Sequence, residues 1–370
     1  MRININAFCF GCMGVQKQGS SFVRALSRYT DIALFPWDPV PPLDVLPAEV
    51  RRWLGNARGQ DVAGNTGIGI GVLNRMPCVV GRKKVAYIVW ETSRIPEREL
   101  AYLDGAEEIW IPSTWGKSIL EANGVDPHRI SVVPEGVDEG QYRPMHADRG
   151  VAGRKFRLLC VGKWEKRKGI DVLLRAYARA FAPGEPVELV LHCHNANRPG
   201  LHMRAVVDDL HLPPHPSILY SAPVPEARMP LLYNGCDAFV LPTRGEGWGL
   251  PIIEAMACAK PVIVTRCGAH LDFVNDGNAY LIDVKAMVRV DDADNFDPSL
   301  DFGEWAEPDE EHLAWLLRRV FENRDEARVL GEAARRDVVQ GWTWGHAAGK
   351  AWELLRGSAS GSCREGGTLQ

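Results

Sequence analysis

Two glutamates lie on either side of a glycine turn in RGEGWGLPIIEAMACAKP, residues 244–261. Pro251 suits the first turn of a helix, so residues 247–250 are expected to present free backbone amides, which bind anions or hydroxyl groups. Glu246 precedes the turn and Glu254 comes one helical turn later, so we expect both carboxylates to face one pocket and accept hydrogen bonds from sugar hydroxyls. Two unrelated surface glutamates are the alternative, but a lone charge in so apolar a helix needs a partner.

A cluster of cations follows an apolar strand in the segment VGKWEKRKG, residues 161–169. The basic residues are Lys163, Lys166, Arg167 and Lys168. Cations at the carboxyl end of a strand suit a diphosphate, because their charges neutralise its oxygens. A solvated basic loop is the alternative, and the spacing alone does not decide between the two.

A third segment, GCMGVQKQGSSF at residues 11–22, follows the first apolar strand. Its glycines, Gly14 and Gly19 among them, would let the backbone approach a ligand, and Ser20 or its neighbour could cap the next helix. The G-x-G-x-x-G spacing of a dinucleotide site is absent here and in GIGIGV, residues 67–72.

The composition is that of a globular protein, with 370 residues of which 46% are hydrophobic and 24% charged. This length predicts about two domains. A net charge of −4 does not favour nucleic-acid binding. No apolar run reaches the ~18 residues of a membrane span, and the N-terminus has the pattern of a strand rather than a signal peptide. The nine cysteines are irregularly spaced and do not indicate a disulfide framework, so we expect a cytoplasmic protein.

Short apolar runs alternate with helical periodicity, which predicts an α/β fold with parallel sheets. Strands are expected at residues 3–8, 32–35, 67–73, 85–89, 109–112, 130–133, 156–161, 187–192, 217–220, 238–241, 261–264 and 279–282. We therefore predict two Rossmann-like domains that face each other across a cleft.

The boundary between these domains is expected in HADRGVAGRK, residues 146–155, which is polar and without periodicity. The resulting divisions are a first domain at 1–145, a second domain at 146–345, a helix near 346–356 that packs back on the first domain, and a disordered tail at 357–370. Residues 285–309 are acidic and irregular, so we expect a surface loop there.

The chain resembles the retaining glycosyltransferases of the GT-B fold, and within them glycosyltransferase family 4 (glycosyl transferases group 1). The E-x7-E signature of that family is matched by Glu246 and Glu254. Its basic diphosphate clamp resembles VGKWEKRKG, with Lys168 in the lysine position and Lys163 where arginine is commoner. ISVVPEGVDEGQYRP resembles the segment between the domains, and LLYNGCDAFVLPT the strand before the signature. The resemblance covers most of residues 1–356.

The resemblance implies roles for particular residues. Lys163 and Lys168 would stabilise the leaving diphosphate, Glu246 and the amides of Gly247, Trp248, Gly249 and Leu250 would hold the donor sugar, and Glu254 would bind the ribose. Gly14, Gly19, Ser20 and Glu135 would line the acceptor side of the cleft. Neither a metal ion nor another cofactor is expected, because lysines and a helix N-terminus supply the countercharge.

Three positions depart from the family pattern. Glu135 stands where asparagine or histidine is usual, and Asp272 where glutamate is usual. Glu91, after the strand VAYIVW, stands where many members carry a histidine near the reacting sugar, so we expect it to be catalytic together with Glu246 and Lys168. The alternative for this segment is a helix cap at Thr92 or its neighbour.

We therefore expect a retaining glycosyltransferase that uses a nucleoside-diphosphate sugar. Its acceptor is a glycan, a lipid-linked or a small molecule, with cell-surface polysaccharide or glycolipid assembly, a mannosyl group and a GDP-linked donor weakly favoured. A sugar-nucleotide epimerase and a non-catalytic sugar-nucleotide binder are the alternatives. RRWLGNARG and GRKK could bring the protein to the inner face of the membrane.

Overall fold

The computed structural model describes residues 2–11, 13–58, 62–145, 155–195, 200 and 202–361. The predicted boundary at 146–155, apart from Lys155, lies outside the described residues, and so does the predicted tail from residue 362 onwards.

The first half of the chain alternates strands and helices. Its elements are β1 (Arg2–Ala7), α1 (Gly14–Leu26), β2 (Asp31–Pro36), α2 (Ala48–Asn56), β3 (Thr66–Gly71), β4 (Lys83–Ile88), α3 (Glu97–Leu100), β5 (Glu108–Ile111), α4 (Thr114–Ala122) and β6 (Ile130–Val132), with short 3-10 turns at Leu43–Val45, Val62–Gly64, Leu73–Cys78, Ala101–Leu103 and Pro127–Arg129. In the described residues these strands form one parallel sheet of six, ordered β2-β1-β3-β4-β5-β6.

The second half repeats this plan. Its elements are β7 (Phe156–Val161), α5 (Ile170–Ala180), β8 (Val187–His192), α6 (Met203–Asp209), β9 (Ile218–Tyr220), α7 (Met229–Asn234), β10 (Ala238–Leu241), α8 (Leu250–Ala257), β11 (Val262–Thr265), β12 (Tyr280–Ile282), β13 (Val284–Arg289), β14 (Glu304–Pro308), α9 (Glu310–Glu322), α10 (Arg324–Gly341) and α11 (Trp344–Gly361), with 3-10 turns η6 (Lys166–Lys168), η7 (Glu226–Arg228) and η8 (Ala269–Asp272). Over the described range, a second parallel sheet of six strands runs β12-β11-β10-β7-β8-β9.

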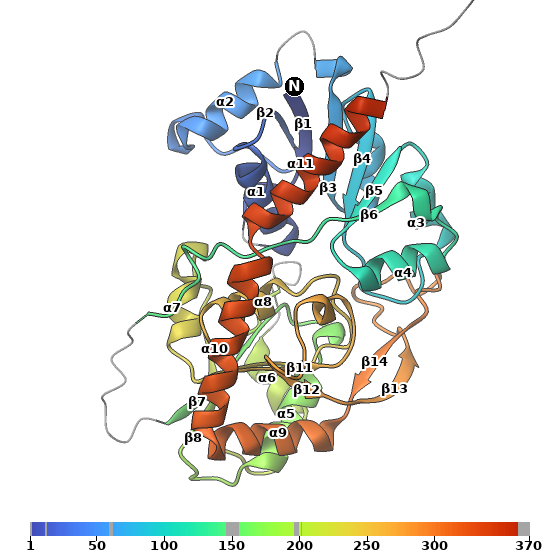
Figure 1. The fold of residues 1–370 in the computed structure, drawn as a ribbon. Coiled ribbons are helices and arrows are strands. Elements are labelled where there is room, and N and C mark those ends of the chain that lie inside the picture. The colour runs from blue at the N-terminus through green and yellow to red at the C-terminus, as the bar shows by residue number, and fades with distance from the viewer. Residues whose placement is uncertain are drawn as a thin grey trace, which may run out of the picture.

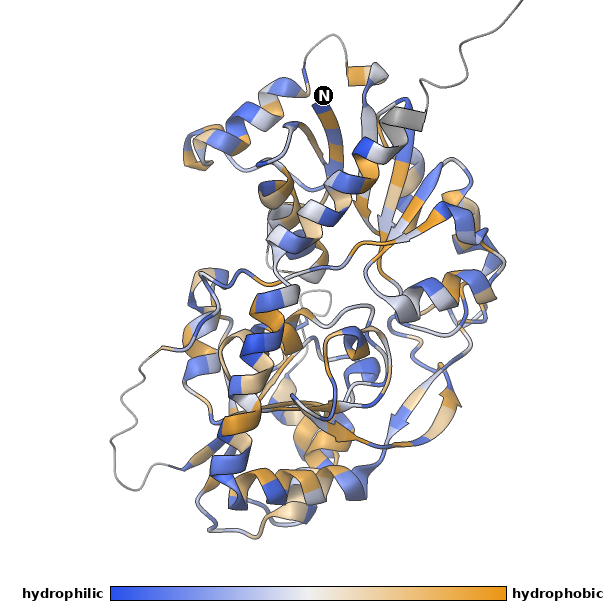
Figure 2. Cartoon of the chain, in the orientation of Figure 1, coloured by the Kyte–Doolittle hydropathy of each residue, from blue (hydrophilic) through white to orange (hydrophobic). Residues whose placement is uncertain are grey.

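Each predicted strand is present, with its ends displaced by no more than a couple of residues. The reason is visible in β4, where Val85 and Tyr87 join one hydrophobic cluster and Ala86 and Ile88 join another on the opposite face. A strand buried on both faces is apolar throughout, which makes it easy to recognise. Figure 2 shows these apolar strands inside each domain, with hydrophilic residues on the outer faces of the helices.

The two domains lie one above the other and are joined by two crossings of the chain (Figure 1). The segment after β6 leads into the second domain, and the segment before α11 returns from it. These segments meet where Val137 and Thr343 form a parallel bridge. Helix α11 then packs on α1 of the first domain. It continues to Gly361, past the end near residue 356 that we expected, since each added residue extends an existing hydrogen-bonded helix.

Two local predictions were wrong. Helix α1 begins at Gly14, so the residues expected in a glycine loop are helical, because the Gln16 side chain accepts a hydrogen bond from the Met13 amide and starts the helix early. The segment 285–309 is a loop only in its middle, residues 290–303, because β13 and β14 at its two ends pair as an antiparallel hairpin. Trp305 on this hairpin is buried.

None of the described helices is long and apolar enough to cross a membrane.

Candidate functional site

The cationic turn after β7 buries two of its basic side chains. Arg167 and Lys168 lie in η6, and both are less than a tenth exposed. Gly169 follows with φ of 64°, and a Cβ at this position would lie 1.9 Å from the Pro242 carbonyl oxygen. The turn is therefore pressed against the end of β10, which directs its buried cations toward the glycine turn that follows that strand.

The buried Lys168 pairs with the first glutamate of the signature. Its Nζ donates a hydrogen bond of 2.6 Å to Oε1 of Glu246. Lys163 is different: its side chain is 39% exposed, and its Nζ lies 2.9 Å from Oε1 of Glu165. The solvated-loop alternative therefore describes part of the cationic segment, and the buried part faces the signature.

Arg167 is a site residue that the spacing did not single out. Its Nη1 donates to the Gly245 carbonyl at 2.7 Å. Its guanidinium also lies within ion-pair distance of the carboxylates of Glu165 (3.3 Å), Glu91 (3.4 Å) and Glu246 (3.6 Å). Because Glu91 belongs to the first domain, Arg167 is the cation that joins the predicted catalytic carboxylate to the second domain. The sequence shows only four basic residues close together. What distinguishes Arg167 is its burial in a 3-10 turn, which the sequence does not show.

The charged side chains around Arg167 and Lys168 influence the protonation of the carboxyl groups near them. Burial alone raises the pKa of Glu246, but Lys168 and Arg167 outweigh it and bring that pKa down to about 2. Burial, together with Arg167, lowers the pKa of Lys168. Glu135 behaves in the opposite way: burial, and then the negative charges of Glu91 and Glu246, raise its pKa to about 8. At neutral pH the cluster therefore holds an ionised Glu246 beside a protonated Glu135.

The glycines of the signature turn allow the two domains to touch. A Cβ on Gly245 would lie 2.3 Å from the Glu91 carbonyl oxygen. A Cβ on Gly247 would lie 2.1 Å from Cγ1 of Val89 and 2.8 Å from the Trp90 carbonyl oxygen. Both glycines therefore allow the signature turn to lie directly against the first-domain backbone that follows β4, the segment that contains Glu91. This places Glu91 and Glu246 on facing walls of the interdomain contact.

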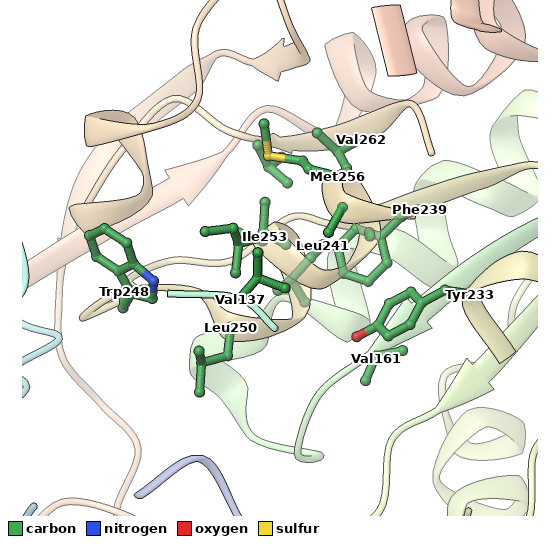
Figure 3. Packing of buried hydrophobic residues seen from close by; sticks show 14 of the residues in the cluster. Val137, Val161, Tyr233, Phe239, Leu241, Trp248, Leu250, Ile253, Met256 and Val262 are labelled. Carbon is green, nitrogen blue, oxygen red and sulfur yellow. The ribbon is translucent and has the colours of Figure 1, made fainter. Parts of the chain in front are cut away.

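The N-terminus of α8 has the free amides that the sequence predicted. Within the described residues, the amides of residues 247–249 donate no hydrogen bond. The Trp248 ring, however, packs in the core, with ring centroids 4.9 Å from Phe273 and 5.6 Å from Trp342. Figure 3 shows Trp248 and Leu250 within the buried hydrophobic cluster. These two residues can therefore contribute only their backbones to a ligand site.

The second signature glutamate belongs to a separate group of polar residues. Glu254 is buried on α8, and its carboxylate pairs with the ammonium of Lys17 from α1 of the first domain. Tyr233 donates to Oε2 of Glu254 at 2.8 Å. Lys17 also lies 2.9 Å from Glu226, which accepts a hydrogen bond from Tyr142. Burial raises the pKa of Glu254 above its ordinary value even though Lys17 opposes this.

Glu246 and Glu254 therefore do not face one pocket. A small cavity of about 40 Å³ is lined by Lys17, Tyr142, Glu226, Glu254, Trp344 and their neighbours, and Glu246 does not contribute to it. The partner that an apolar helix requires for its glutamate is Lys17, which stands 237 residues away. No local pattern could have identified that pair.

Three of the four residues predicted on the acceptor side of the cleft lie in α1. Gly14 opens α1, and Gly19 packs so closely that a Cβ there would lie 2.1 Å from the Phe8 carbonyl oxygen. Ser20 lies in α1 and donates to the Lys17 carbonyl at 3.3 Å, so it does not cap the helix. Gly19 is thus a packing residue in this structure.

Ser20 also borders a second cavity, of about 170 Å³, at the carboxyl ends of β1 and β2. Its lining is mostly apolar and consists of Cys9, Phe10, Ser20, Val23, Arg24, Leu34, Leu46, Pro47, Val50 and Trp53.

Other contacts hold the two domains together near this site. Asp272 of η8 accepts hydrogen bonds from the amide (2.8 Å) and hydroxyl (2.6 Å) of Thr114, at the N-terminus of α4. The cap predicted as an alternative role for the segment after Glu91 is absent in the described residues, because Thr92 donates to the Arg94 carbonyl instead and α3 begins only at Glu97. No group of three or more described His, Cys, Asp or Glu side chains is arranged to hold a metal ion.

Comparison with known proteins shows a family resemblance in the second domain. A sequence profile described as "Glycosyl transferases group 1" matches residues 155–296, which include the cationic turn and both signature glutamates. The second domain of this chain is therefore similar to the glycosyl transferases group 1 family. This match supports the resemblance that the sequence motifs indicated.

Curated relatives of this chain include D-inositol 3-phosphate glycosyltransferases. The protein from Corynebacterium kroppenstedtii is 27% identical over 270 residues, which cover 70% of this chain and 54% of the relative. A second, from Catenulispora acidiphila, is 33% identical over 183 residues, which cover 44% of this chain and 40% of the relative. The chain thus spans about half the length, or less, of the curated relatives it matches.

Solved structures show the same two-domain architecture. The sucrose-phosphate synthase of Thermosynechococcus elongatus has a TM-score of 0.72 at 16% identity, covering 97% of this chain and 99% of its own. Anabaena HepE in complex with UDP-glucose has a TM-score of 0.70 at 14% identity, covering 96% and 100%. The predicted GT-B fold is confirmed.

Proposed function

We propose that this protein transfers a sugar from a nucleoside-diphosphate donor to an acceptor hydroxyl, with retention of the anomeric configuration. The observation that carries the proposal is the ionised Glu246, held by Lys168 and Arg167 beside the free amides of α8 and opposite Glu91. Cations, a helix N-terminus and hydrogen-bond acceptors at one interdomain contact suit a sugar diphosphate.

In this proposal each side chain of the cluster has one task. Lys168, the more exposed Lys163 and the amides of residues 247–249 neutralise the diphosphate. Glu246, ionised over the whole neutral range, accepts hydrogen bonds from hydroxyls of the donor sugar. Glu254 accepts the ribose hydroxyls, and Lys17 then keeps Glu226 and Tyr142 as its partners. No metal ion or other cofactor is required for these tasks.

The proposed reaction is a front-face displacement. The bond between C1 of the sugar and the diphosphate oxygen breaks while the acceptor oxygen bonds to C1 from the same face. The acceptor proton passes to the departing phosphate oxygen, which balances the charge. Glu91, facing this centre from the first domain, stabilises the positive charge that develops on the sugar.

For the donor and the acceptor we propose classes of molecule. Anabaena HepE was solved with UDP-glucose, which favours UDP-sugars for testing beside the GDP-linked donor weakly indicated by the sequence. Among acceptors, the names of the curated relatives suggest an inositol phosphate. The apolar cavity beside Ser20 instead favours an acceptor with an acyl or aromatic part, as in glycolipid or polysaccharide assembly. Such an acceptor would bring a cytoplasmic protein to the inner face of the membrane.

A panel of nucleotide sugars tests the proposal. Unfolding temperature would be measured with UDP-, GDP-, ADP- and dTDP-sugars, since a ligand at 100 times its dissociation constant adds about 2.7 kcal/mol of stability. We expect one nucleotide class to raise the unfolding temperature, and NMR of the product to show the anomeric configuration of the donor. Absence of any shift across the panel, or an inverted product, would contradict the proposal. Neither an epimerase nor a non-catalytic binder is favoured by the relatives.

A further inference from the structure

The β13–β14 hairpin is fastened to the signature turn through Arg244. This buried side chain donates from Nε and Nη2 to both oxygens of Glu307 on β14, at 2.6 and 2.8 Å. It also reaches both oxygens of Asp171 on α5, at 3.0 and 3.1 Å. The Ala306 amide donates to the Arg244 carbonyl at 2.9 Å. Since Arg244 stands two residues before Glu246, the base of the hairpin and the signature turn form one rigid unit.

The other end of the hairpin pairs with the first domain. The amides of Ser93 and Arg94 donate to the carbonyls of Glu304 and Phe302, each at 3.1 Å. In return, the Glu304 amide donates to Oγ of Ser93 at 2.7 Å. Figure 1 shows the hairpin extending from the second domain toward the helices α3 and α4 of the first. Backbone hydrogen bonds of this kind fix a register, which long side chains in surface ion pairs do not.

Aromatic packing and a glycine tighten this contact. The ring of Phe302 stacks on Trp90, with centroids 6.1 Å apart and an interplanar angle of 22°. Phe296 supports Phe302 from the side, with centroids 4.8 Å apart. Gly303 has φ of 74°, and a Cβ there would lie 2.4 Å from Oγ of Ser93. Only glycine allows the hairpin to approach this closely without strain.

The hairpin therefore contacts the chain on both sides of Glu91. Phe302 packs on Trp90, which precedes Glu91, and the paired backbone follows two residues later at Ser93. The Glu91 side chain itself is 35% exposed, and Arg167 is its ion-pair partner, at 3.4 Å. A carboxylate on a loop needs such external support, because a misplacement of about 1 Å can cost about a hundredfold in rate.

We propose that the β13–β14 hairpin is a positioning element for Glu91, with Phe302 and Gly303 as its positioning residues. The hairpin belongs to the domain that binds the donor, so Glu91 reaches its working position only when the cleft is closed. This inference rests on the proposed sugar transfer, in which Glu91 acts at the reaction centre. It also explains why an acidic segment of the second domain folds as a hairpin rather than as a loose loop.

The test uses Phe302→Ala, with Phe302→Tyr as the conservative variant and Met287→Ala as the matched control. Met287 lies on β13 of the same hairpin and is 53% exposed. We expect Phe302→Ala to lower kcat at least tenfold while the donor KM changes less than twofold. Phe302→Tyr keeps the stacked ring and should restore most of kcat, and Met287→Ala should match the wild type. Partial loss of folding would also lower kcat without changing KM, so the unfolding temperature of each variant is measured as well and should equal that of the wild type.

Amide hydrogen exchange provides a second readout that needs no substrate. The amides of Ser93 and Arg94 should be protected in the wild type and exchange faster in Phe302→Ala and in Ser93→Ala, which removes the hydroxyl acceptor. Unprotected wild-type amides would overturn the inference, and so would wild-type kcat in Phe302→Ala despite faster exchange. A wild-type protein that binds and transfers no sugar would instead contradict the proposed function, and the exchange results would still report on the contact.

Discussion

Lys17 of α1 is ion-paired with Glu254 of α8, so that a first-domain cation holds the carboxylate proposed to bind the donor ribose. Both side chains are largely buried, with 16% and 4% of their surfaces exposed. Tyr233 completes the contact from the second domain, and Glu226 offers Lys17 another partner. This pair joins the two domains beside α8, and under the proposed function Lys17 has to move away from Glu254 when the donor binds.

Breaking this buried pair should destabilise the protein. Lys17→Met leaves Glu254 as a buried charge without its cation, which we expect to lower the free energy of unfolding by about 3 kcal/mol at pH 7. The loss should shrink as the pH is lowered, because a protonated Glu254 needs no cation. Chemical denaturation measures both effects. The control is Arg24→Met, which breaks the exposed pair of Arg24 with Glu49 and should change stability by less than about 1 kcal/mol. Equal effects of the two variants would contradict the description of the Lys17 pair.

Glu91 should matter for turnover and little for folding. Glu91→Gln keeps the shape of the side chain and removes the charge that faces Arg167 and the donor site. We expect kcat to fall by about a hundredfold or more, as when a charge-stabilising group is removed, with little change in donor affinity or unfolding temperature. Steady-state kinetics and calorimetric titration measure these quantities. Near wild-type turnover would leave Glu91 as a structural residue.

Glu135 should give the protein a specific pH dependence. Burial and the charges of Glu91 and Glu246 raise its pKa to about 8, so the folded state keeps a proton that the unfolded state releases near pH 4.5. The folded state binds more protons between these values, so this group lowers stability as the pH rises from about 4.5 to about 8. Glu135→Gln removes the effect.

The expected result for Glu135→Gln is a stability equal to wild type near pH 4 and greater by a few kcal/mol near pH 8, since one pKa unit is about 1.4 kcal/mol. Denaturant unfolding across this range gives the difference directly. A difference that stays constant with pH would mean that Glu135 is not protonated in the folded protein.

The fold was largely predictable because its strands are central and buried on both faces, as β4 illustrates. The β13–β14 hairpin was not, because β13 is mostly exposed and part of the hairpin's support comes from the other domain. Likewise the glycine turn and its glutamates were found from local pattern, whereas the Lys17–Glu254 pair joins residues far apart in the chain. Burial, rather than spacing, distinguishes Arg167 and Lys168 from the more exposed Lys163.

Sugar transfer should continue in excess EDTA. The countercharge for the diphosphate comes from Lys163, Lys168 and the amides of α8 in this account, so removing divalent ions should change kcat less than twofold. The assay compares EDTA-treated protein with and without added Mg²⁺ or Mn²⁺. A strict and reversible requirement for either ion would contradict the electrostatic assignment.

Calorimetric titration of the preferred nucleotide sugar tests the central claim, that the donor binds between the cationic turn and α8. Lys168→Ala removes the buried ammonium beside Glu246, and Glu254→Ala removes the proposed ribose acceptor. The control is Lys155→Ala. Lys155 directly precedes β7, at the end of the strand opposite the cationic turn, and its side chain donates a hydrogen bond to Ser217. We predict at least tenfold weaker donor binding in both site variants, with the control and all circular dichroism spectra unchanged. Wild-type donor affinity in both Lys168→Ala and Glu254→Ala would place the donor elsewhere and contradict the account.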